Sequence, residues 1–161
     1  MPAAKRRPAA TAAAGAAVPL PFRIINWIGI IDQLAATRAN RLLKPLDMAL
    51  PQFIVLNHFS HRPAEGRTVT AVARALQQPQ PGMTKTIQKL LLRRWLREQV
   101  HPDDARSKLL FLTSAGLARH NDAVAIFARE LAPAFAGWTH TELEQLFAQL
   151  DRLKRWLDEN R

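Results

Sequence analysis

The sequence contains no cysteine, and this absence removes several kinds of chemistry at once. Disulfides, thiolate metal sites, cysteine nucleophiles and thiol redox sensing all need a sulfur that the chain does not have. No run approaches the roughly 18 uninterrupted apolar residues that a membrane-spanning helix requires. Polar side chains interrupt the most apolar stretch, residues 24–34, so we interpret it as a buried or interface helix. We expect a cytoplasmic protein without a membrane segment.

Motifs of enzyme active sites are also missing from the sequence. It has no Gly-rich phosphate loop, no nucleophile elbow and no motif with metal-ligand spacing. His58 and His61 lie three residues apart, a spacing that can share a metal, but no cysteine and no nearby acidic residue completes a ligand set. We therefore expect no enzyme activity, no cofactor and no metal site.

Acidic side chains are absent from residues 66–97, although the whole chain carries 13 Asp and Glu beside 23 Lys and Arg. A net charge of +10 attracts polyanions, so nucleic acid, an anionic membrane or an acidic protein are all possible partners. Residues 139–161 are nearly balanced in charge, and this asymmetry places the anion-binding surface within residues 66–97. The basic side chains of that stretch are Arg67, Arg74, Lys85, Lys89, Arg93, Arg94 and Arg97.

The length of 161 residues suits one domain with a hydrophobic core. Residues 1–21 are rich in Ala and Pro and include a basic cluster at residues 5–7. A signal peptide is the alternative interpretation, but residues 11–17 contain only Ala, Gly and Thr and offer no apolar core for one. We expect residues 1–21 to form a disordered basic tail and residues 22–161 to form a single domain.

Long helices are predicted at both ends of this domain. Residues 22–44 read as a helix that is apolar on more than one face and therefore must be covered on more than one face, and Pro45 ends it. A helix capped by Thr113 or Ser114 and a last helix over residues 139–158 follow at the other end. We expect residues 22–44 and 114–161 to form a dimer. The interface residues would be Ile24, Ile28, Leu146, Leu150, Leu153 and Leu157.

Residues 50–113 have the pattern of a winged helix. Helices are predicted over residues 51–61, 68–77 and 81–94, and the last of these is apolar on one side and polar and basic on the other. Two short helices joined by a tight break are typical of a helix-turn-helix. Strands at residues 96–101 and 108–112, joined by a turn at 102–106, would complete a wing. The fold class is therefore mainly α-helical with a small β-wing.

Two motifs resemble one known family. The run PGMTKTIQKL at residues 81–90 resembles the recognition helix of MarR-family transcription regulators. Asp104-Ala105-Arg106, followed by Leu-Thr-Ser-Ala-Gly at residues 112–116, resembles the wing signature of the same family. The resemblance covers about residues 22–158. It implies an obligate homodimer on a pseudo-palindromic operator, with a recognition helix in each major groove and a wing at each neighbouring minor groove.

One position departs from the family pattern. The family usually has Gly just after the recognition helix, where this chain has Arg94 followed by Trp95. Gly permits the left-handed backbone that ends many helices, so we expect the exit from this helix to be shaped differently. This departure leaves the first residue of the next strand undetermined. It does not change the predicted fold.

The recognition helix supplies the expected base contacts. Thr84, Lys85 and Gln88 are the predicted base readers, since Gln can pair bidentately with adenine. Lys89 and Arg93, together with Thr68 at the start of the preceding helix, are expected to bind phosphate, which fixes register without reading sequence. The alternative is an ordinary solvated helix face. The missing acids and the predicted wing favour the DNA interpretation.

The wing supplies a second set of expected contacts. Arg106 at its tip is predicted to enter the minor groove, where the negative potential of narrow A·T tracts attracts a guanidinium. Asp104 would repel phosphate, so we expect it to orient Arg106 through a carboxylate–guanidinium bond. Lys108, in the second strand, is included among the DNA-binding residues.

An aromatic or lipophilic effector is expected where the first two helices meet the helix after the wing. Trp27 and Ile31 would form an apolar wall, and His58 and His61 would provide polar handles. The alternative is that these side chains form packed core and a solvated helix end. With no thiol to oxidise, ligand binding is the natural trigger for release from DNA.

The sequence thus supports two hypotheses. The first is a sequence-specific double-stranded DNA-binding transcription regulator, acting as a homodimeric repressor that a small ligand releases. The second is an architectural or protein-interaction module that uses the winged helix without reading sequence. The ratio of affinities for a specific site and for random DNA separates the two.

Overall fold

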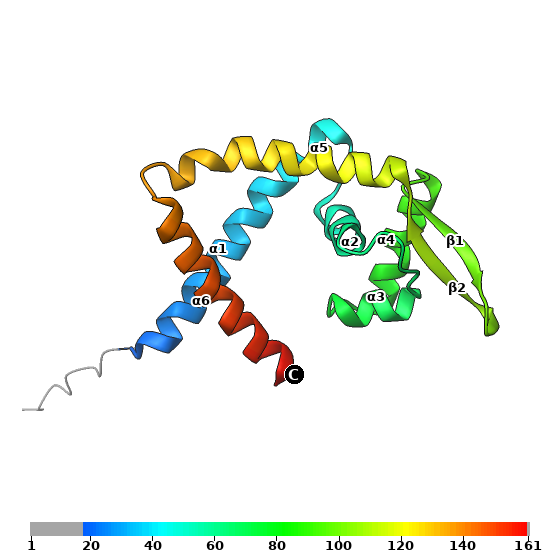
Figure 1. Cartoon of the computed structure of the whole chain (residues 1–161), viewed down its shortest axis with the longest axis horizontal. Helices are drawn as coiled ribbons and strands as arrows, with labels where there is room; N and C mark the ends of the chain where they lie inside the picture. The colour runs from blue at the N-terminus through cyan, green and yellow to red at the C-terminus, as the bar shows by residue number, and fades with distance from the viewer. Residues whose placement is uncertain (1–17, 161) are drawn as a thin grey trace, which may run out of the picture. The chain divides into compact units, whose positions relative to one another are not determined.

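The computed structural model describes residues 18–160 (Figure 1). The described residues fall into two compact units, with the division between residues 37 and 38. Residues 1–17, most of the predicted tail, lie outside the described residues. The rest of the chain is mostly helical and contains one two-stranded antiparallel sheet. The predicted fold class is confirmed. No helix within residues 18–160 has the length and apolar character needed to cross a membrane.

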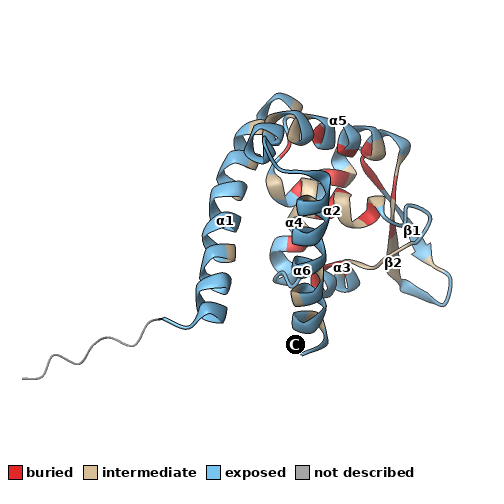
Figure 2. Cartoon of the chain, turned by 60° about the vertical axis from the view of Figure 1, so that its left-hand side comes forward, coloured by how far each residue is buried: buried red, intermediate tan, exposed pale blue. Residues whose placement is uncertain are grey.

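The first unit consists, in its described part, of most of helix α1, Leu20–Leu42. The helix begins two residues before the expected Phe22 and contains no buried residue, as Figure 2 shows along its length. It ends at Leu42 rather than at Lys44, because Pro45 lies within a short 3-10 helix, η1 (Lys44–Leu46). Proline has no backbone N–H to continue an α-helical ladder, which accounts for the change of helix type.

The second unit contains the remaining elements. Threonines begin three of its helices: the hydroxyl oxygens of Thr68, Thr113 and Thr139 accept hydrogen bonds from backbone N–H groups three residues later. These caps satisfy donors that a helix start otherwise leaves unpaired. The elements are α2 (Leu50–Ser60), α3 (Val69–Ala75), α4 (Gln80–Leu92), β1 (Leu96–His101), β2 (Asp104–Leu112), α5 (Ser114–Leu131), η2 (Ala132–Phe135) and α6 (His140–Glu159).

The hydrophobic core lies between α2, α3, α4, the hairpin and the first half of α5 (Figures 1 and 2). Of the four residues expected on the inner side of α4, Met83, Ile87 and Leu90 are at most 5% exposed, whereas Leu91 is half-buried. Helix α6, in contrast, has no buried residue. The largest fully buried side chains are Phe59, Leu43, Leu56, Ile87, Leu90, Leu96, Leu110, Val55 and Val72.

The β-hairpin has a shorter turn than the sequence suggested. Strand β1 has the predicted bounds, but β2 begins at Asp104 instead of Lys108, so that only residues 102–103 form the turn. The register is irregular at the tip: Val100 pairs with Lys108, whereas His101 pairs with Asp104. Residues 105–107 therefore form a bulge, which composition alone does not reveal because Pro and Asp favour a turn throughout this stretch.

The exit from α4 also differs from the expectation. Arg94 adopts a left-handed backbone with φ 57°, the conformation for which Gly is usually required. The N–H of Trp95 donates to the carbonyl of Leu90 and that of Arg94 to Leu91, both at 2.9 Å, which is the Schellman pattern. The predicted change of shape was wrong, since Arg94 takes the glycine conformation, and β1 begins at Leu96.

Candidate nucleic-acid interface

Helix α4 presents a polar and basic surface opposite its buried side. Lys85, Gln88 and Lys89 are exposed, and α4 packs on α3 in the helix-turn-helix arrangement. Thr84 is half-buried, and its hydroxyl donates to the carbonyl of Gln80 at 2.9 Å. The oxygen of that hydroxyl keeps acceptor capacity, so Thr84 can accept from a base edge but has already used its one donor.

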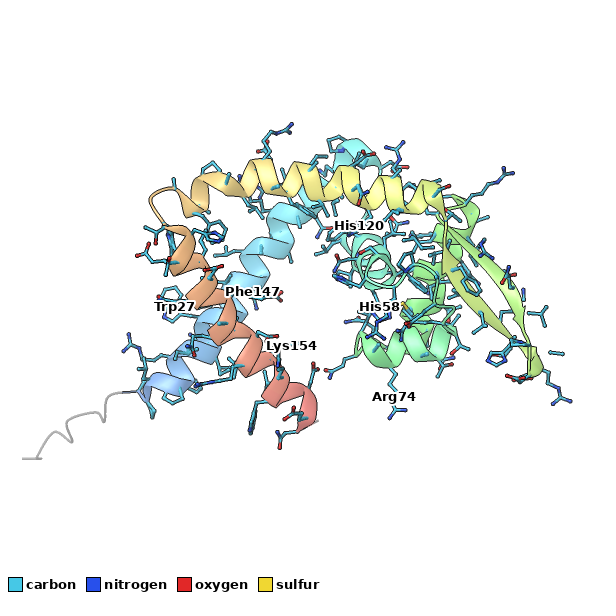
Figure 3. All side chains as sticks on the ribbon, in the orientation of Figure 1. Trp27, His58, Arg74, His120, Phe147 and Lys154 are labelled. Atoms are coloured by element: carbon cyan, nitrogen blue, oxygen red, sulfur yellow. The ribbon has the colours of Figure 1, made fainter. Side chains whose placement is uncertain are left out.

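Helix α3 adds a cation that the sequence-based set of site residues omitted. Arg74 is exposed and extends outward from α3 (Figure 3). Within residues 18–160, neither Arg74 nor Lys85 nor Lys89 forms an ion pair, so these three charges are free for an anion. Among the basic side chains of residues 66–97, Arg74 was assigned no DNA contact from the sequence, although it lies opposite the buried Val72 and Ala73.

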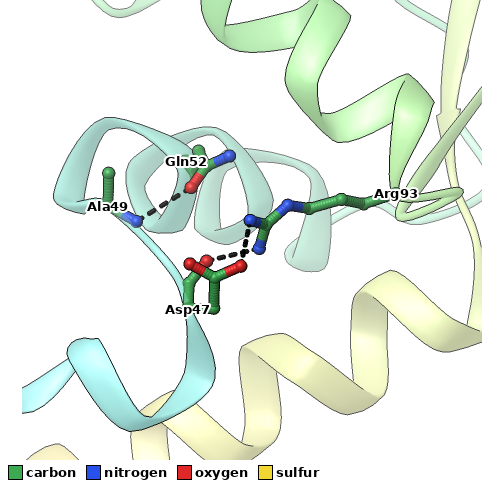
Figure 4. A network of polar contacts seen from close by, with 4 residues as sticks. All are labelled: Asp47, Ala49, Gln52 and Arg93. Atoms are coloured by element: carbon green, nitrogen blue, oxygen red, sulfur yellow. Dashed lines mark hydrogen bonds and ion pairs between the residues drawn. The ribbon is translucent and has the colours of Figure 1, made fainter.

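Arg93 has a protein partner where the sequence suggested phosphate. Its guanidinium pairs with the carboxylate of Asp47 and also donates to the backbone carbonyl of that residue (Figure 4). The guanidinium lies over the ring of Trp95, 4.9 Å from its centroid. These contacts join the end of α4 to η1. The two residues are 46 positions apart, so local sequence patterns gave no sign of this ion pair.

In the wing, the carboxylate of Asp104 makes a different contact with Arg106 from the one predicted. The Asp104 carboxylate accepts a hydrogen bond of 3.0 Å from the backbone N–H of Arg106, and not from the guanidinium as expected. This local bond shapes the bulge and leaves the exposed Arg106 side chain without an ion pair in the described residues. Lys108 forms a cross-strand ion pair with Glu98. Of the predicted wing cations, Arg106 alone is unpaired within residues 18–160.

Contacts between the start of α5 and the backbone at the exit of α4 fix the position of α4. The Thr113 hydroxyl lies 2.8 Å from the carbonyl of Arg94 and 3.0 Å from that of Trp95, and its oxygen accepts from the N–H of Gly116. A Cβ on Gly116 would lie 2.1 Å from the Trp95 carbonyl oxygen. The start of α5 therefore approaches the exit of α4 so closely that only glycine fits, which gives a physical reason for the Leu-Thr-x-x-Gly spacing.

The four residues of the predicted effector pocket belong to two different units. Trp27 and Ile31 lie in residues 1–37, and His58 and His61 lie in residues 38–161. Burial lowers the pKa of His58 below its usual value, and the nearby Arg67 and His61 lower it further. The Nε2 atom of His58 is buried and has no hydrogen-bond partner among residues 18–160. The pocket remains a prediction.

No group of three or more His, Cys, Asp or Glu side chains within residues 18–160 is arranged so that it could hold a metal ion. His120, in α5, makes other contacts: its Nε2 lies 3.0 Å from the amide oxygen of Asn57, and its ring stacks on Phe53 with centroids 5.6 Å apart. This histidine therefore joins α5 to α2.

Comparison with known proteins gives one family. The family model described as "MarR family" matches residues 46–107. The chain is similar to wild-type MarR of E. coli in its apo form, with 25% identity, 84% of this chain and 97% of that chain covered, and a TM-score of 0.69. None of the curated proteins is significantly similar in sequence.

Two further solved structures share the fold. The MarR protein of Peptoclostridium difficile is 19% identical, covers 86% of this chain and 89% of its own, and has a TM-score of 0.72. The MepR–DNA complex of S. aureus is 22% identical, with 82% and 96% covered and a TM-score of 0.67. In all three proteins the similarity extends well beyond the residues that the family model matches.

Proposed function

We propose that the protein is a transcription regulator of the MarR family, whose model matches residues 46–107, and that it binds double-stranded DNA in a sequence-specific manner. The observation that carries the proposal is the surface of α3 and α4. Three unpaired cations, Arg74, Lys85 and Lys89, lie there beside the exposed amide of Gln88, and residues 66–97 contain no acid. A surface of this kind attracts phosphate and offers a side chain that can read a base.

The roles of the individual residues follow from their exposure. Lys85 and Gln88 are exposed on α4 and would contact base edges, with the acceptor oxygen of Thr84 beside them. Lys89 and Arg74, and the capped start of α3 at Thr68, would contact phosphates. Arg106, unpaired in the wing, would enter the minor groove. The similar fold of MepR has been solved on DNA, which supports this placement of the winged helix.

A homodimer is part of the proposal. Large apolar side chains on both terminal helices are exposed, among them Ile24 at 46%, Leu150 at 43% and Phe147 at 72%. Exposed apolar surface of this extent favours association with another protein surface. Proteins of the MarR family are typically dimeric, which supports a second copy of this chain as the partner. Two copies related by a two-fold axis would present two recognition helices to a pseudo-palindromic operator.

Footprinting on the DNA that flanks the protein's own coding region tests the proposal. We expect a protected pseudo-palindrome, bound at least about 1,000-fold more tightly than random DNA at the same salt concentration. Gln88→Ala should relax the preference at one base pair, whereas Arg74→Ala should weaken binding to all sequences equally. Equal affinity for the protected site and random DNA would instead favour the architectural module.

Repression released by a small ligand is the finer part of this proposal. The effector would be an aromatic or lipophilic molecule, since small-molecule pockets usually combine an apolar wall with a few polar groups. Such a ligand must bind more tightly to the form that cannot hold DNA. Aromatic acids titrated into the protein–DNA complex should quench Trp fluorescence and lower DNA anisotropy together. A panel that quenches without releasing DNA would contradict a regulatory role.

A further inference from the structure

Helix α4 ends beside an acidic residue that its own stretch of sequence does not contain. Residues 66–97 have no Asp or Glu, but the fold places the carboxylate of Asp47, at the end of η1, on the guanidinium of Arg93 (Figure 4). The same guanidinium donates to the backbone carbonyl of Asp47. Lys89 lines the same hollow but forms no ion pair within the described residues, so it stays available to an anion.

We propose that Asp47 and Arg93 are positioning residues for DNA recognition. Their ion pair fixes the end of the recognition helix and keeps Arg93 from binding phosphate, and both effects favour a specific site over random DNA. The inference rests on the proposed function of α4 as the recognition helix. Base contacts need one fixed register of that helix, whereas a free cation binds phosphate on any sequence. The pair would therefore determine specificity without contacting a base.

The backbone at Asp47 is anchored in the hydrophobic core. Leu43 and Met48, on either side of it in the sequence, are 0% and 4% exposed. The N–H of Asp47 donates to the carbonyl of Lys44 at 2.9 Å, and the N–H of Met48 donates to that of Leu43 at 3.2 Å. The carboxylate of Asp47 is thus exposed to solvent while its main chain is held in place, and it offers Arg93 a fixed partner.

Arg93 is held from the side of α4. Its N–H donates to the carbonyl of Lys89 at 3.2 Å, and its guanidinium lies over the ring of the buried Trp95, 4.9 Å from the centroid. A single exposed ion pair contributes little, because water and side-chain entropy compete with it. An arginine that has a carboxylate, a carbonyl and an aromatic ring as partners has few other orientations. The pair therefore limits movement of the last turn of α4 relative to η1.

The two effects of the pair have opposite signs once the Asp47 carboxylate is removed. The end of α4 is then less firmly held, which lowers affinity for the operator. Arg93 becomes a free cation beside Lys89, which raises affinity for DNA of any sequence. A loss of stability alone would lower both affinities, and a loss of negative charge alone would raise both. The opposite signs thus distinguish positioning from either simpler role.

Asp47→Asn tests the pair in the full chain. The side chain is 90% exposed, and Asn tolerates the left-handed backbone of this residue, φ 49°, so the variant should fold. Two duplexes of equal length, the footprinted operator and a random sequence, are titrated over a range of salt concentrations. Affinity for random DNA should rise about fivefold, with a salt slope steeper by about 1 for each protomer. Affinity for the operator should fall by about the same factor, because a displaced α4 loses part of a base contact.

Two further variants separate positioning from charge. Asp122 forms an exposed ion pair of 3.4 Å with Arg119 on α5, so Asp122→Asn removes the same charge away from α4. It should change both affinities by one common factor and leave their ratio unaltered. Arg93→Gln breaks the pair without freeing a cation, so it should lower affinity for the operator without raising affinity for random DNA. Combined with Asp47→Asn, it should weaken operator binding no further than either change alone.

Three results would overturn the inference. An equal rise on both duplexes with Asp47→Asn would mean that Asp47 acts only through its negative charge. An equal fall on both, with a lower melting temperature, would mean that the pair only stabilises the fold. An equal loss of preference with Asp122→Asn would mean that the net charge decides. A wild-type protein without preference for the operator would contradict the proposed function as well, whereas a preference that Asp47→Asn leaves unchanged would contradict this inference alone.

Discussion

Gln77 ends α3 in a conformation that suits it poorly. Its φ is 50°, in the left-handed region, and the N–H of Gln78 donates to the carbonyl of Ala73 at 2.9 Å to close the turn. A side chain in this region costs about 1–2 kcal/mol relative to glycine, and glycine in turn loses more chain entropy on folding. Gln77→Gly should therefore raise the free energy of unfolding by about 0.5–1 kcal/mol, measured by urea denaturation.

The neighbouring residue provides the control at this scale. Gln78 is also exposed but has no positive φ, so Gln78→Gly gains no relief and should lower stability by about 0.5 kcal/mol. Equal effects of the two substitutions would show that the backbone at Gln77 is not the source of the stabilisation.

His58 makes stability depend on pH. Burial, with Arg67 and His61 nearby, lowers the pKa of His58 below 6.5, so the unfolded chain takes up a proton more readily than the folded one. Well above pH 6.5 His58 is neutral in both states and does not affect the free energy of unfolding. As the pH falls from 6.5 toward the lower pKa of the folded state, protonation of the unfolded chain lowers the free energy of unfolding. His58→Gln should remove this loss, so that the variant gains stability relative to wild type between pH 7.5 and 5.5. If the free energies of unfolding of wild type and His58→Gln, measured in urea, change in parallel with pH, His58 is not the source of the pH dependence.

At the scale of elements, the ring of Phe111 holds the hairpin against the α2–α3 loop, because both Gly66 and Arg97 contact it. Gly66 lies against Phe111, and the guanidinium of Arg97 lies 4.5 Å from the centroid of the same ring. A Cβ on Gly66 would come within 2.4 Å of the ring, so Gly66→Ala must displace Phe111 and should cost about 1–3 kcal/mol. A double-mutant cycle with Phe111→Leu should recover part of that loss, as measured by thermal unfolding.

Another glycine distinguishes this clash from a general effect of alanine. Gly82 lies in α4, and a Cβ there meets no atom within 4 Å. Gly82→Ala should thus stabilise the helix by up to about 1 kcal/mol. A cycle in which Gly66→Ala and Phe111→Leu are strictly additive would show that the ring is not what the added methyl displaces.

Sequence patterns predicted these elements where the deciding interactions are local. Helical periodicity placed α4 within two residues at each end. Thr68 was placed at the start of α3, and Thr113 was one of two candidate caps of α5 beside Ser114, because a cap acts over three residues. The bulge of β2 is decided by pairing across the hairpin, which composition does not encode. The ion pair of Arg93 with Asp47 depends on tertiary packing. The left-handed Arg94 shows that surrounding hydrogen bonds can impose a backbone that the residue type does not favour.

At the scale of the whole molecule, the terminal helices lack enough cover for their apolar surface. Neither α1 nor α6 contains a buried residue, and Leu150 is 43% exposed on α6. We expect light scattering at micromolar concentration to give the mass of a dimer. Leu150→Glu should abolish the dimer and lower the melting temperature together, since it buries an unpaired charge at the interface.

Gln149 gives the matched control for the dimer. It is exposed on the same helix, and Gln149→Glu introduces the same charge without removing a large apolar side chain. This variant should stay dimeric. A folded monomer for the unaltered chain, or an unchanged dimer with Leu150→Glu, would contradict an interface through α6.

The hairpin has a consequence for how the protein meets a polyanion. Residues 96–112 carry three basic and three acidic side chains, so the wing as a whole is electrically neutral. Binding to DNA releases condensed counterions in proportion to the phosphates that are neutralised. A neutral hairpin displaces few of them, and the slope of affinity against salt should be determined mainly by the unpaired cations of α3 and α4. The wing's contribution to affinity would then persist at salt concentrations that weaken the helices, and the preference for one groove shape over another would sharpen as salt rises.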